Sequence, residues 1–362
     1  MRKLARKQCL PGGAERTMFA IGLSEEERLI QQTARRFASE RLGPRLREHE
    51  RSRAIFPALL QEFSTLGLAS VDRPVADGGQ GLGAFCKVLM LEELAVADAG
   101  AALALDPSGL AVYPLMEAGA LALVRDGRRC GVVDDTAERF RVAGERVSGD
   151  FPWIAADEVD AVLILGSRRA LLVDDGIQTT PVRPCGLEVA GASELRLRDA
   201  AIALRIEDAG AVARARARIR VHVAALLVGV ARAACAYATR YATERTAFGK
   251  PIAHHQALAF LLVDMAIAVD AARMAGWRAG VAIDRGDDPV WAGAAALAEA
   301  AEQALFVTLN AVQVLGGHGF MKDHPVEKYM RDARTLAQLG GGRDACELDA
   351  AAVVVDHDLG IG

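Results

Sequence analysis

The sequence is poor in aromatic residues and in lysine. Phe, Trp and Tyr make up 5% of the 362 residues, whereas all hydrophobic types make up 52%, and only six of the 43 basic residues are lysine. A core with few rings and much alanine favours closely packed helices. A net charge of −4 with scattered arginines argues against a nucleic-acid partner, because such proteins carry a strong positive field.

Paired cysteines and long apolar runs are also missing. The six cysteines form no C-x-x-C motif, which is typical of a protein in a reduced cytoplasm. The longest apolar run, over 221–231, contains His222 and is shorter than the about 20 residues that span a bilayer. We therefore expect a cytoplasmic protein with no membrane span. Residues 1–22 carry basic residues without an apolar signal core, and they predict a disordered lead-in.

Signatures of several enzyme classes are absent as well. The sequence has no E-x-x-H, so the usual di-iron site of a helical bundle is not predicted. It has no H-E-x-x-H, G-x-S-x-G or P-loop motif either. The Gly-Gly-His-Gly run at 316–319 does not follow a predicted strand, so a Rossmann dinucleotide site is not predicted. We expect no metal site.

Hydrophobic periodicity divides the chain into helical and strand-forming parts. Ser24 followed by three glutamates predicts a helix N-terminus. Further helices are predicted at about 57–66, 82–97, 108–120, 209–245, 254–285, 289–316, 325–337 and 343–354. Short strands are predicted at 140–142, 161–165, 170–173 and 195–197.

The predicted fold is mostly α with a small β domain. An N-terminal helical domain is expected over 23–120, a middle β-barrel-like domain over 121–206 and a C-terminal four-helix bundle over 207–362. The disordered lead-in over 1–22 precedes them.

The stretch from Tyr241 to Ile252 lies between two long helical patterns. Gly249 and Pro251 stop the first helix, and Arg245 and Phe248, three positions apart near its end, are predicted to share a face. A guanidinium beside a flat ring suits a phosphate or a planar ligand. On spacing alone, a helix-hairpin turn whose arginine caps carbonyls is the alternative.

A second stretch reads Q-V-L-G-G-H-G-F from Gln313 and H-P-V-E-K-Y-M-R-D-A-R from His324. Together the two stretches resemble the C-terminal motifs of the flavin-dependent acyl-CoA dehydrogenase family. The family patterns are R-x-x-F-G-x-P-I-x-x-x-Q, Q-x-x-G-G-x-G-[FY] and P-V-E-[KR]-x-x-R-D-A-[KR], and every fixed position is present in order. The L-G-L, G-G-x-G and E-E-L-A runs over 66–95 extend the resemblance toward the N-terminus.

The resemblance implies FAD-dependent α,β-dehydrogenation of an acyl-CoA thioester, in which a carboxylate removes the α-proton and the flavin takes the β-hydride. It also implies an oligomer, because the family shares FAD between protomers, and an electron-transfer flavoprotein as electron acceptor. A substrate contact is implied for Arg220, with an ion pair as the alternative. Cofactor contacts are implied for Arg245, Phe248, Gln256, Gln313, Gly316, Gly317 and Trp153. A plain helix C-cap is the alternative for the two glycines.

The sequence departs from the family at the catalytic base. The usual glutamate, nine residues after the arginine of R-D-A, is replaced by Gly340. Some members carry the base one residue before the arginine that Arg220 matches, and here that residue is Ile219. Asp344 and Glu347 follow shortly after Gly340 and are candidates for a relocated base, with solvated helix-start residues as the alternative.

Two flavin-contacting segments depart from the family too. The T-E-P-x-A-G-S-D motif that should precede the β domain is absent from residues 120–135. The W-I-[ST] run is Trp153-Ile-Ala155, so the ring is kept and the hydroxyl is lost. A positioned general base typically contributes about 10²–10⁴-fold in rate. The combined losses predict a chain that does not assemble a full site alone.

The chain therefore resembles the degenerate subunit of heteromeric family members, such as those of bacterial steroid degradation, in which a base-carrying partner completes the site. Fatty acid or steroid degradation is the expected pathway class. A catalytically silent structural or regulatory homo-oligomer with little or no FAD is one alternative, and an active homo-oligomer with a relocated base is another.

Overall fold

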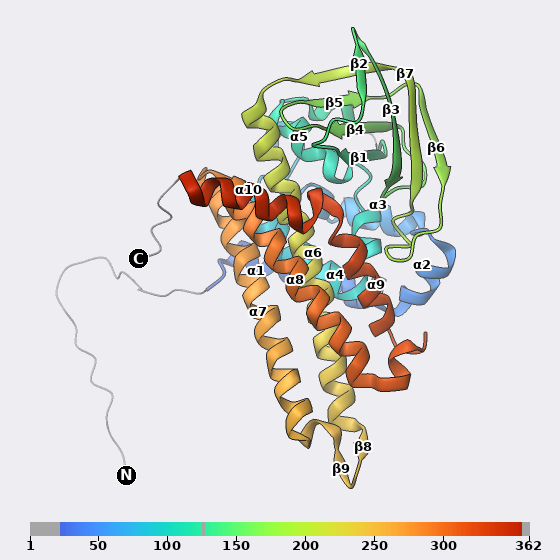
Figure 1. Ribbon diagram of the computed structural model, residues 1–362, viewed down its shortest axis with the longest axis vertical. Helices are drawn as coiled ribbons and strands as arrows, with labels where there is room; N and C mark the ends of the chain where they lie inside the picture. The colour runs from blue at the N-terminus through green and yellow to red at the C-terminus, as the bar shows by residue number, and fades with distance from the viewer. Residues whose placement is uncertain (1–21, 125–126, 357–362) are drawn as a thin grey trace, which may run out of the picture.

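The computed structural model describes residues 22–124 and 127–356, in which helices predominate and strands form a smaller second part (Figure 1). The mostly α fold with a small β domain is thus confirmed. The predicted disordered lead-in falls, apart from Gly22, outside the described residues. The helices are α1 Glu25–Phe37, α2 Leu46–Ser52, α3 Pro57–Thr65, α4 Gly83–Ala104, α5 Val112–Glu117, α6 Ala209–Glu244, α7 Gln256–Arg285, α8 Pro289–Leu315, α9 Val326–Leu336 and α10 Gly342–Asp356. The longer strands are β1 Cys130–Asp134, β2 Arg141–Ala143, β3 Arg146–Ile154, β4 Ala161–Leu165, β5 Ala170–Val173, β6 Ile177–Pro181 and β7 Ser193–Ile206.

Helix α1 begins where the sequence predicts. The Ser24 hydroxyl accepts a hydrogen bond from the Glu27 amide at 3.2 Å, and the Glu27 carboxylate accepts one from the Ser24 amide at 2.6 Å. This reciprocal capping box satisfies two amides that the first turn leaves without helical partners. The predicted N-terminus is confirmed.

Helix α4 is longer than predicted because it continues past a break at Asp98. Asp98 has extended backbone angles (φ −163°, ψ 109°) inside the helix. Its carboxylate accepts hydrogen bonds from the amides of Gly100 and Ala101 at 3.0 and 3.3 Å. Asp98 thus caps a second helical segment in the way of an N-cap residue. The helix predicted over 82–97 corresponds to the first segment alone.

One long strand joins the two parts of the β domain. Strand β7 pairs with β3 and β6 along its first half and with β5 along its second, giving the order β1-β4-β5-β7-β3-β2 with β6 beside β7. Strands β1 and β4 run parallel, and the other pairs are antiparallel. The prediction missed β1, β3 and β6 and found only residues 195–197 of β7. These strands have irregular burial, so their sequences alternate poorly between apolar and polar.

The C-terminal part is built on three long helices. Helix α6 packs against α8 and α4, and α7 packs beside α8 (Figure 1). The shorter α10 lies across their ends nearest the β domain (Figure 1). Helix α6 is long and apolar enough to cross a membrane by length and composition, but 78% of its most apolar window is buried inside the protein. That burial is typical of the central helix of a bundle.

A buried glutamate joins α4 to the bundle. Glu92 is 1% exposed, and its carboxylate accepts hydrogen bonds from Arg232 at 3.2 Å, from Arg273 at 3.2 Å and from the Trp277 indole at 2.9 Å. These partners lie on α6 and α7. The E-E-L-A run therefore fixes the N-terminal helices to the bundle, because a buried charge needs such partners.

A buried lysine joins α9 to α4 and to the β domain. Lys328 is 1% exposed, and its ammonium lies 2.9 Å from Asp98 Oδ1 and 2.6 Å from Asp332 Oδ2. Asp332 also accepts a hydrogen bond from the Leu187 amide at 2.8 Å, just before β7. The break in α4 thus places a carboxylate where α9 presents its lysine.

Arg331, on the next turn of α9, ties the same helix to α2. Its guanidinium lies 2.5 Å from Glu50 and 2.8 Å from Glu327, and it donates to the Cys185 carbonyl at 2.6 Å. Burial opposes ionisation of Glu50, but its hydrogen bonds to Arg331 and Arg47 outweigh that effect and lower the pKa of Glu50. The P-V-E-K and R-D-A residues of the second motif stretch therefore hold three parts of the chain together.

We predict that Lys328→Met destabilises the protein by about 3–5 kcal/mol, because it leaves Asp98 and Asp332 buried without their cation. The free energy of unfolding from urea denaturation measures the effect. The exposed lysine of the same region provides the control: Lys322→Met should change that free energy by less than about 0.5 kcal/mol. Equal effects in the two variants would contradict the role given to Lys328.

We predict that stability falls with acidification partly through His222. This histidine is buried on α6 with its Nδ1 2.9 Å from the Tyr113 hydroxyl, and burial lowers the pKa of His222 well below its ordinary value. In the unfolded chain this histidine takes up a proton near pH 6.5, whereas in the folded chain it stays neutral. Its contribution to the free energy of unfolding is therefore complete above that pH and is lost below it, by up to about 1.4 kcal/mol per pH unit. His222→Gln should flatten the unfolding free energy between pH 7 and 5, measured by urea denaturation, whereas the exposed His254→Gln should leave the slope unchanged.

Candidate functional site

The first motif stretch lies at the end of the bundle farthest from the β domain, in the hairpin between α6 and α7 (Figure 1). Helix α6 ends at Glu244, Arg245 is already extended, and Phe248 has a positive φ of 52° in the turn between β8 Thr246–Ala247 and β9 Lys250–Pro251. The prediction that Arg245 and Phe248 share a helix face is therefore wrong. The hairpin forms because Lys250 and Pro251 pair back onto Ala247 and Thr246.

The hairpin presents its candidate residues to solvent. Phe248 is 96% exposed, and Arg245 and Gln256 are exposed as well. Arg245 has no ion pair among the described residues. An almost fully exposed phenyl ring beside an arginine with no ion pair leaves an aromatic face and a free charge available for contact with another molecule.

The second motif stretch reaches the same end of the bundle. Gln313, Gly316 and Gly317 are exposed where α8 ends, and a Cβ built on either glycine would meet nothing within 4 Å. Tyr241 of the first stretch and His318 of the second are joined by a hydrogen bond of 2.8 Å between the hydroxyl and Nδ1. The structure thus brings the two stretches together, with open backbone on their outer side.

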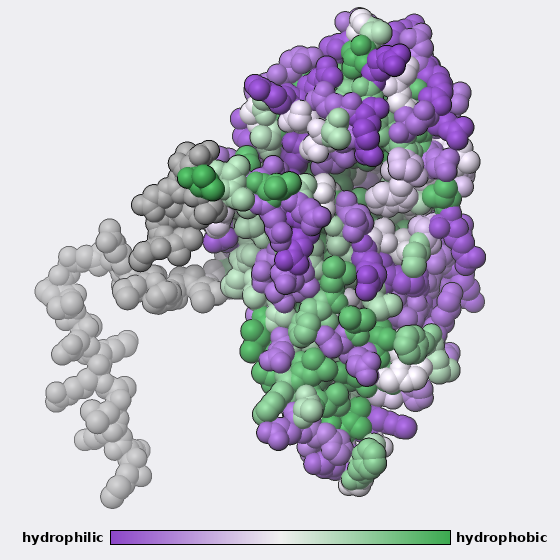
Figure 2. Space-filling model, in the orientation of Figure 1, coloured by the Kyte–Doolittle hydropathy of each residue, from purple (hydrophilic) through white to green (hydrophobic). Residues whose placement is uncertain are grey.

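A strip of exposed apolar side chains adjoins these stretches along α7 and α8. Figure 2 shows apolar residues gathered over this part of the bundle. Its larger members are Phe260, Val263, Ile267, Phe306 and Leu309, which are between 36% and 62% exposed. An exposed apolar patch of this kind is typical of a surface that contacts another molecule.

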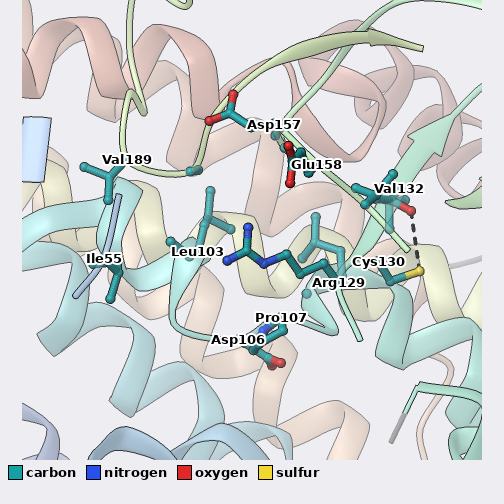
Figure 3. A pocket seen from close by; sticks show the side chains of 18 of the residues that line it. Ile55, Leu103, Asp106, Pro107, Arg129, Cys130, Val132, Asp157, Glu158 and Val189 are labelled. Carbon is teal, nitrogen blue, oxygen red and sulfur yellow. Dashed lines mark hydrogen bonds between the residues drawn. The ribbon is translucent and has the colours of Figure 1, made fainter. Parts of the chain in front are cut away.

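A cavity of about 180 Å³ lies at the opposite side of the chain, between the N-terminal helices and the β domain (Figure 3). Residues 130–132 of β1, Ala155 after β3 and Leu339 before α10 all line it. These are the three segments in which the sequence departs from the family. Trp153 is partly exposed on β3, two residues from Ala155, and is not among the lining residues.

Both expected positions of the base lie together behind Leu339. Gly340 is buried with a positive φ of 66°, and its carbonyl accepts a hydrogen bond from Arg220 Nε at 3.1 Å. A Cβ built on Gly340 would lie 3.3 Å from Arg220 Cγ and 3.7 Å from Ile219 Cγ2. The two alternative seats are thus neighbours in space, and neither carries a carboxylate.

Arg220 is part of a buried charge cluster. It is 1% exposed, and its Nη2 lies 2.6 Å from Asp349 Oδ2 on α10. Asp134, at the end of β1, lies 3.4 Å from Arg216, one turn before Arg220. Burial raises the pKa of Asp134 although both guanidiniums favour its charged form, and its Oδ2 has no hydrogen-bond partner among the described residues.

The structure places the two candidate replacement bases elsewhere. Asp344 and Glu347 are exposed on α10, where Glu347 accepts a hydrogen bond from Arg343 at 2.6 Å. The acid that pairs with Arg220 is Asp349, and neither Asp349 nor Asp134 was among the predicted site residues. The sequence signal for Asp349 is its helical spacing, because it lies one turn after the buried Cys346 and therefore near the same face of α10; its side chain is 47% exposed.

Helix α6 sets the distance between the exposed hairpin and the residues around the base position. Arg220 and Arg245 are 25 positions apart along this helix, which corresponds to about 37 Å at 1.5 Å per residue. A single chain therefore cannot bring its hairpin to its own cavity.

Comparisons with known proteins agree with the fold and its order of parts. Residues 24–123 match the family model "Acyl-CoA dehydrogenase, N-terminal domain" and residues 211–354 match "Acyl-CoA dehydrogenase, C-terminal domain". Cyclohex-1-ene-1-carbonyl-CoA dehydrogenase of Geobacter metallireducens is 30% identical, over 88% of this chain and 95% of that protein. Butyryl-CoA dehydrogenase from Megasphaera elsdenii superposes with a TM-score of 0.81 at 22% identity, covering 93% of this chain and all of that one. The FAD complex of PigA superposes with a TM-score of 0.82 at 21% identity, covering 92% and 98%.

The chain's own cavity does not fit the ring system of FAD. Its 180 Å³ is below the about 300–1,000 Å³ of pockets that bury such ligands, and Arg129 extends into it (Figure 3). None of its lining residues carries a hydroxyl, an aromatic ring or a side-chain amide. The guanidinium of Arg245 and the open backbone at Gly316 have the chemistry to contact the phosphates and adenine of a dinucleotide.

We predict that Gly340→Ala destabilises the protein by about 1–3 kcal/mol, because a side chain there must adopt a left-handed backbone and sit 3.1 Å from Leu297 Cδ2. Thermal unfolding measures the loss. Gly317→Ala is the matched control, since its Cβ meets open space and its φ is not positive, and it should cost less than about 0.5 kcal/mol. A stable Gly340→Ala protein would show that the loop can accommodate a side chain at the base position.

Proposed function

Because the chain belongs to the acyl-CoA dehydrogenase family, we propose that it is a subunit of a FAD-dependent acyl-CoA dehydrogenase that lacks its own catalytic base and works with a base-carrying partner chain of the same family. Fatty acid or steroid degradation is the proposed pathway class and the cytoplasm the proposed location. An electron-transfer flavoprotein is the proposed electron acceptor.

The observation that carries the proposal is the glycine at the base position. Removal of a proton next to a thioester needs a positioned carboxylate, while bound flavin supplies the hydride acceptor. Gly340 and Ile219 offer none, and the backbone angles at Gly340 disfavour any residue with a Cβ. The chain's cavity, moreover, does not fit the flavin ring. These features support a chain that is incomplete for catalysis alone.

The residues that remain intact suit a role toward a neighbour. The guanidinium of Arg245 would hold the phosphates of the partner's FAD, and Phe248 would cover its rings. Gln313, Gly316 and Gly317 would bring backbone to the adenine, and Gln256 would meet the cofactor or the interface. Their exposure at one end of the bundle supports this assignment, because Arg220, which contacts Gly340 at the base position, lies about 37 Å away along α6.

The apolar strip on α7 and α8 supports an oligomer in which this end of the bundle meets another subunit. In a heteromer the partner supplies the base, the acyl-CoA pocket and most flavin contacts. In a homo-oligomer every cavity would have glycine at the base position, which corresponds to the alternative of a silent structural or regulatory assembly.

Co-expression tests the proposal. We expect the chain purified alone to lack flavin absorbance, and the chain co-purified with a base-carrying family member to show flavin and to oxidise an acyl-CoA. Absence of flavin from every combination would support the silent homo-oligomer and contradict the proposal. Turnover by the chain alone would contradict it too, and Asp134→Asn and Asp349→Asn would then locate the base.

We predict that Arg245→Ala lowers the affinity of the co-purified complex for FAD about tenfold or more, because it removes a charge-assisted contact to a phosphate. Flavin retained after dialysis measures the effect. Arg285→Ala is the matched control, because Arg285 is also exposed but lies at the far end of α7, and this variant should retain flavin like the unaltered complex. If both variants retain flavin, the hairpin is not part of the cofactor site.

A further inference from the structure

The cavity combines apolar walls with charged side chains at its solvent side. Arg129 and Glu158 are both exposed, and Figure 3 shows the Arg129 guanidinium pointing into the cavity, with Asp157 and Glu158 on one side of it. The apolar part of the wall comes from Ile55, Leu60, Leu103, Val132, Val189 and Leu339. The cavity therefore has a charged entrance and an apolar interior.

Two of the charged lining residues are already neutralised. Arg53 lies 3.7 Å from Glu188. Asp106 lies 3.1 Å from Arg73 and 3.7 Å from Lys87, and it is 8% exposed. These side chains serve the scaffold, and their charges are compensated before any ligand arrives.

The other charged residues of the lining, Arg129, Glu158 and Asp157, form no ion pair with an opposite charge among the described residues. Neither Arg129 nor Glu158 forms an ion pair within 4 Å or a side-chain hydrogen bond among the described residues. The Asp157 carboxylate accepts one hydrogen bond, from the Ala192 amide at 2.9 Å, and forms no ion pair among the described residues. Charges of both signs thus line the entrance without compensating each other.

Hydrogen bonds fix the backbone of Arg129 in place. The Arg129 amide donates to Asp160 Oδ2 at 2.8 Å, and its carbonyl accepts hydrogen bonds from the amides of Asp160 and Ala161 at 2.8 and 3.2 Å. The backbone is therefore held at the start of β4 while the side chain is free to bind. Pre-organisation of this kind lowers the cost of recognition.

We propose that this cavity binds a small zwitterion, an amino acid with a short aliphatic side chain. Its carboxylate pairs with Arg129, its ammonium pairs with Glu158 and Asp157, and its side chain occupies the apolar interior. A ligand of this class uses every uncompensated charge of the entrance, whereas a plain carboxylate would face two acids and a plain amine would face the guanidinium. The volume of 180 Å³ suits a molecule of that size and excludes an acyl-CoA.

The inference goes beyond the proposed function, because it concerns the chain's own cavity and not the partner's flavin. It needs neither a partner chain nor FAD, so its test can fail while the co-expression experiment succeeds, and the reverse also holds.

Calorimetric titration of the purified full chain without flavin tests the proposal. The three ligands share one branched aliphatic chain. L-leucine carries both charges, isocaproate carries only the carboxylate, and isoamylamine carries only the ammonium. We expect L-leucine to bind at least about tenfold more tightly than either half-molecule. No binding of L-leucine at millimolar concentration, or equal binding of isocaproate, would overturn the proposal.

Two charge-neutral variants locate the contacts. Arg129→Gln and Glu158→Gln should each weaken L-leucine binding by about tenfold or more. The matched control is Arg128→Gln, because Arg128 is the adjacent arginine and already pairs with Asp174 at 3.4 Å, and it should bind L-leucine like the unaltered chain. Thermal unfolding of each variant checks that the fold is kept. Unchanged binding in a folded Arg129→Gln protein would overturn the assignment.

Discussion

A single buried cation determines how the three parts of the chain meet. Lys328 carries its ammonium into the interior between Asp98 of α4 and Asp332 of α9. A buried charge is tolerated only with partners at hydrogen-bond distance, so the contact constrains the position of α9 against α4. The break in α4 at Asp98 and the hydrogen bond from the Leu187 amide follow from the same requirement. Helix α9 leads directly to Gly340, so this contact also sets the loop at the base position.

The two ends of the long central helix α6 differ in their candidate site residues. At one end of α6, the hairpin and the α8 terminus keep the motif residues and leave Arg245, Phe248, Gln256, Gln313, Gly316 and Gly317 exposed. At the other end, the buried Arg220 pairs with Asp349, whose side chain is 47% exposed, beside Arg216 and Asp134. The guanidinium is neutralised there and donates to the Gly340 carbonyl. Exposed motif residues at one end of α6, and a base position without a carboxylate at the other, support the proposal of a subunit that serves a neighbour.

Local rules predicted much of the fold and little of the site. The predicted starts and ends of α6, α7 and α8 agree with the structure to within two residues, because long helices show their periodicity over many turns. The strands β1, β3 and β6 were missed, and the break at Asp98 could not be foreseen. Each of these depends on a partner far away in sequence: Asp98 leaves the helix to meet Lys328, 230 positions later. Arg245 and Phe248 were placed on a helix that ends one residue earlier.

The sequence alone determined the family, the helical architecture and the lack of a carboxylate at both base positions, because a glycine or an isoleucine has no proton acceptor in any conformation. Only the tertiary structure decided that residues near 131, 155 and 339 line one cavity, that Asp134 and Asp349 join Arg220, and that Arg129 and Glu158 stay uncompensated at the entrance. The reason is that ion pairing and cavity shape arise from segments brought together by folding, and their strength depends on burial that no local pattern records.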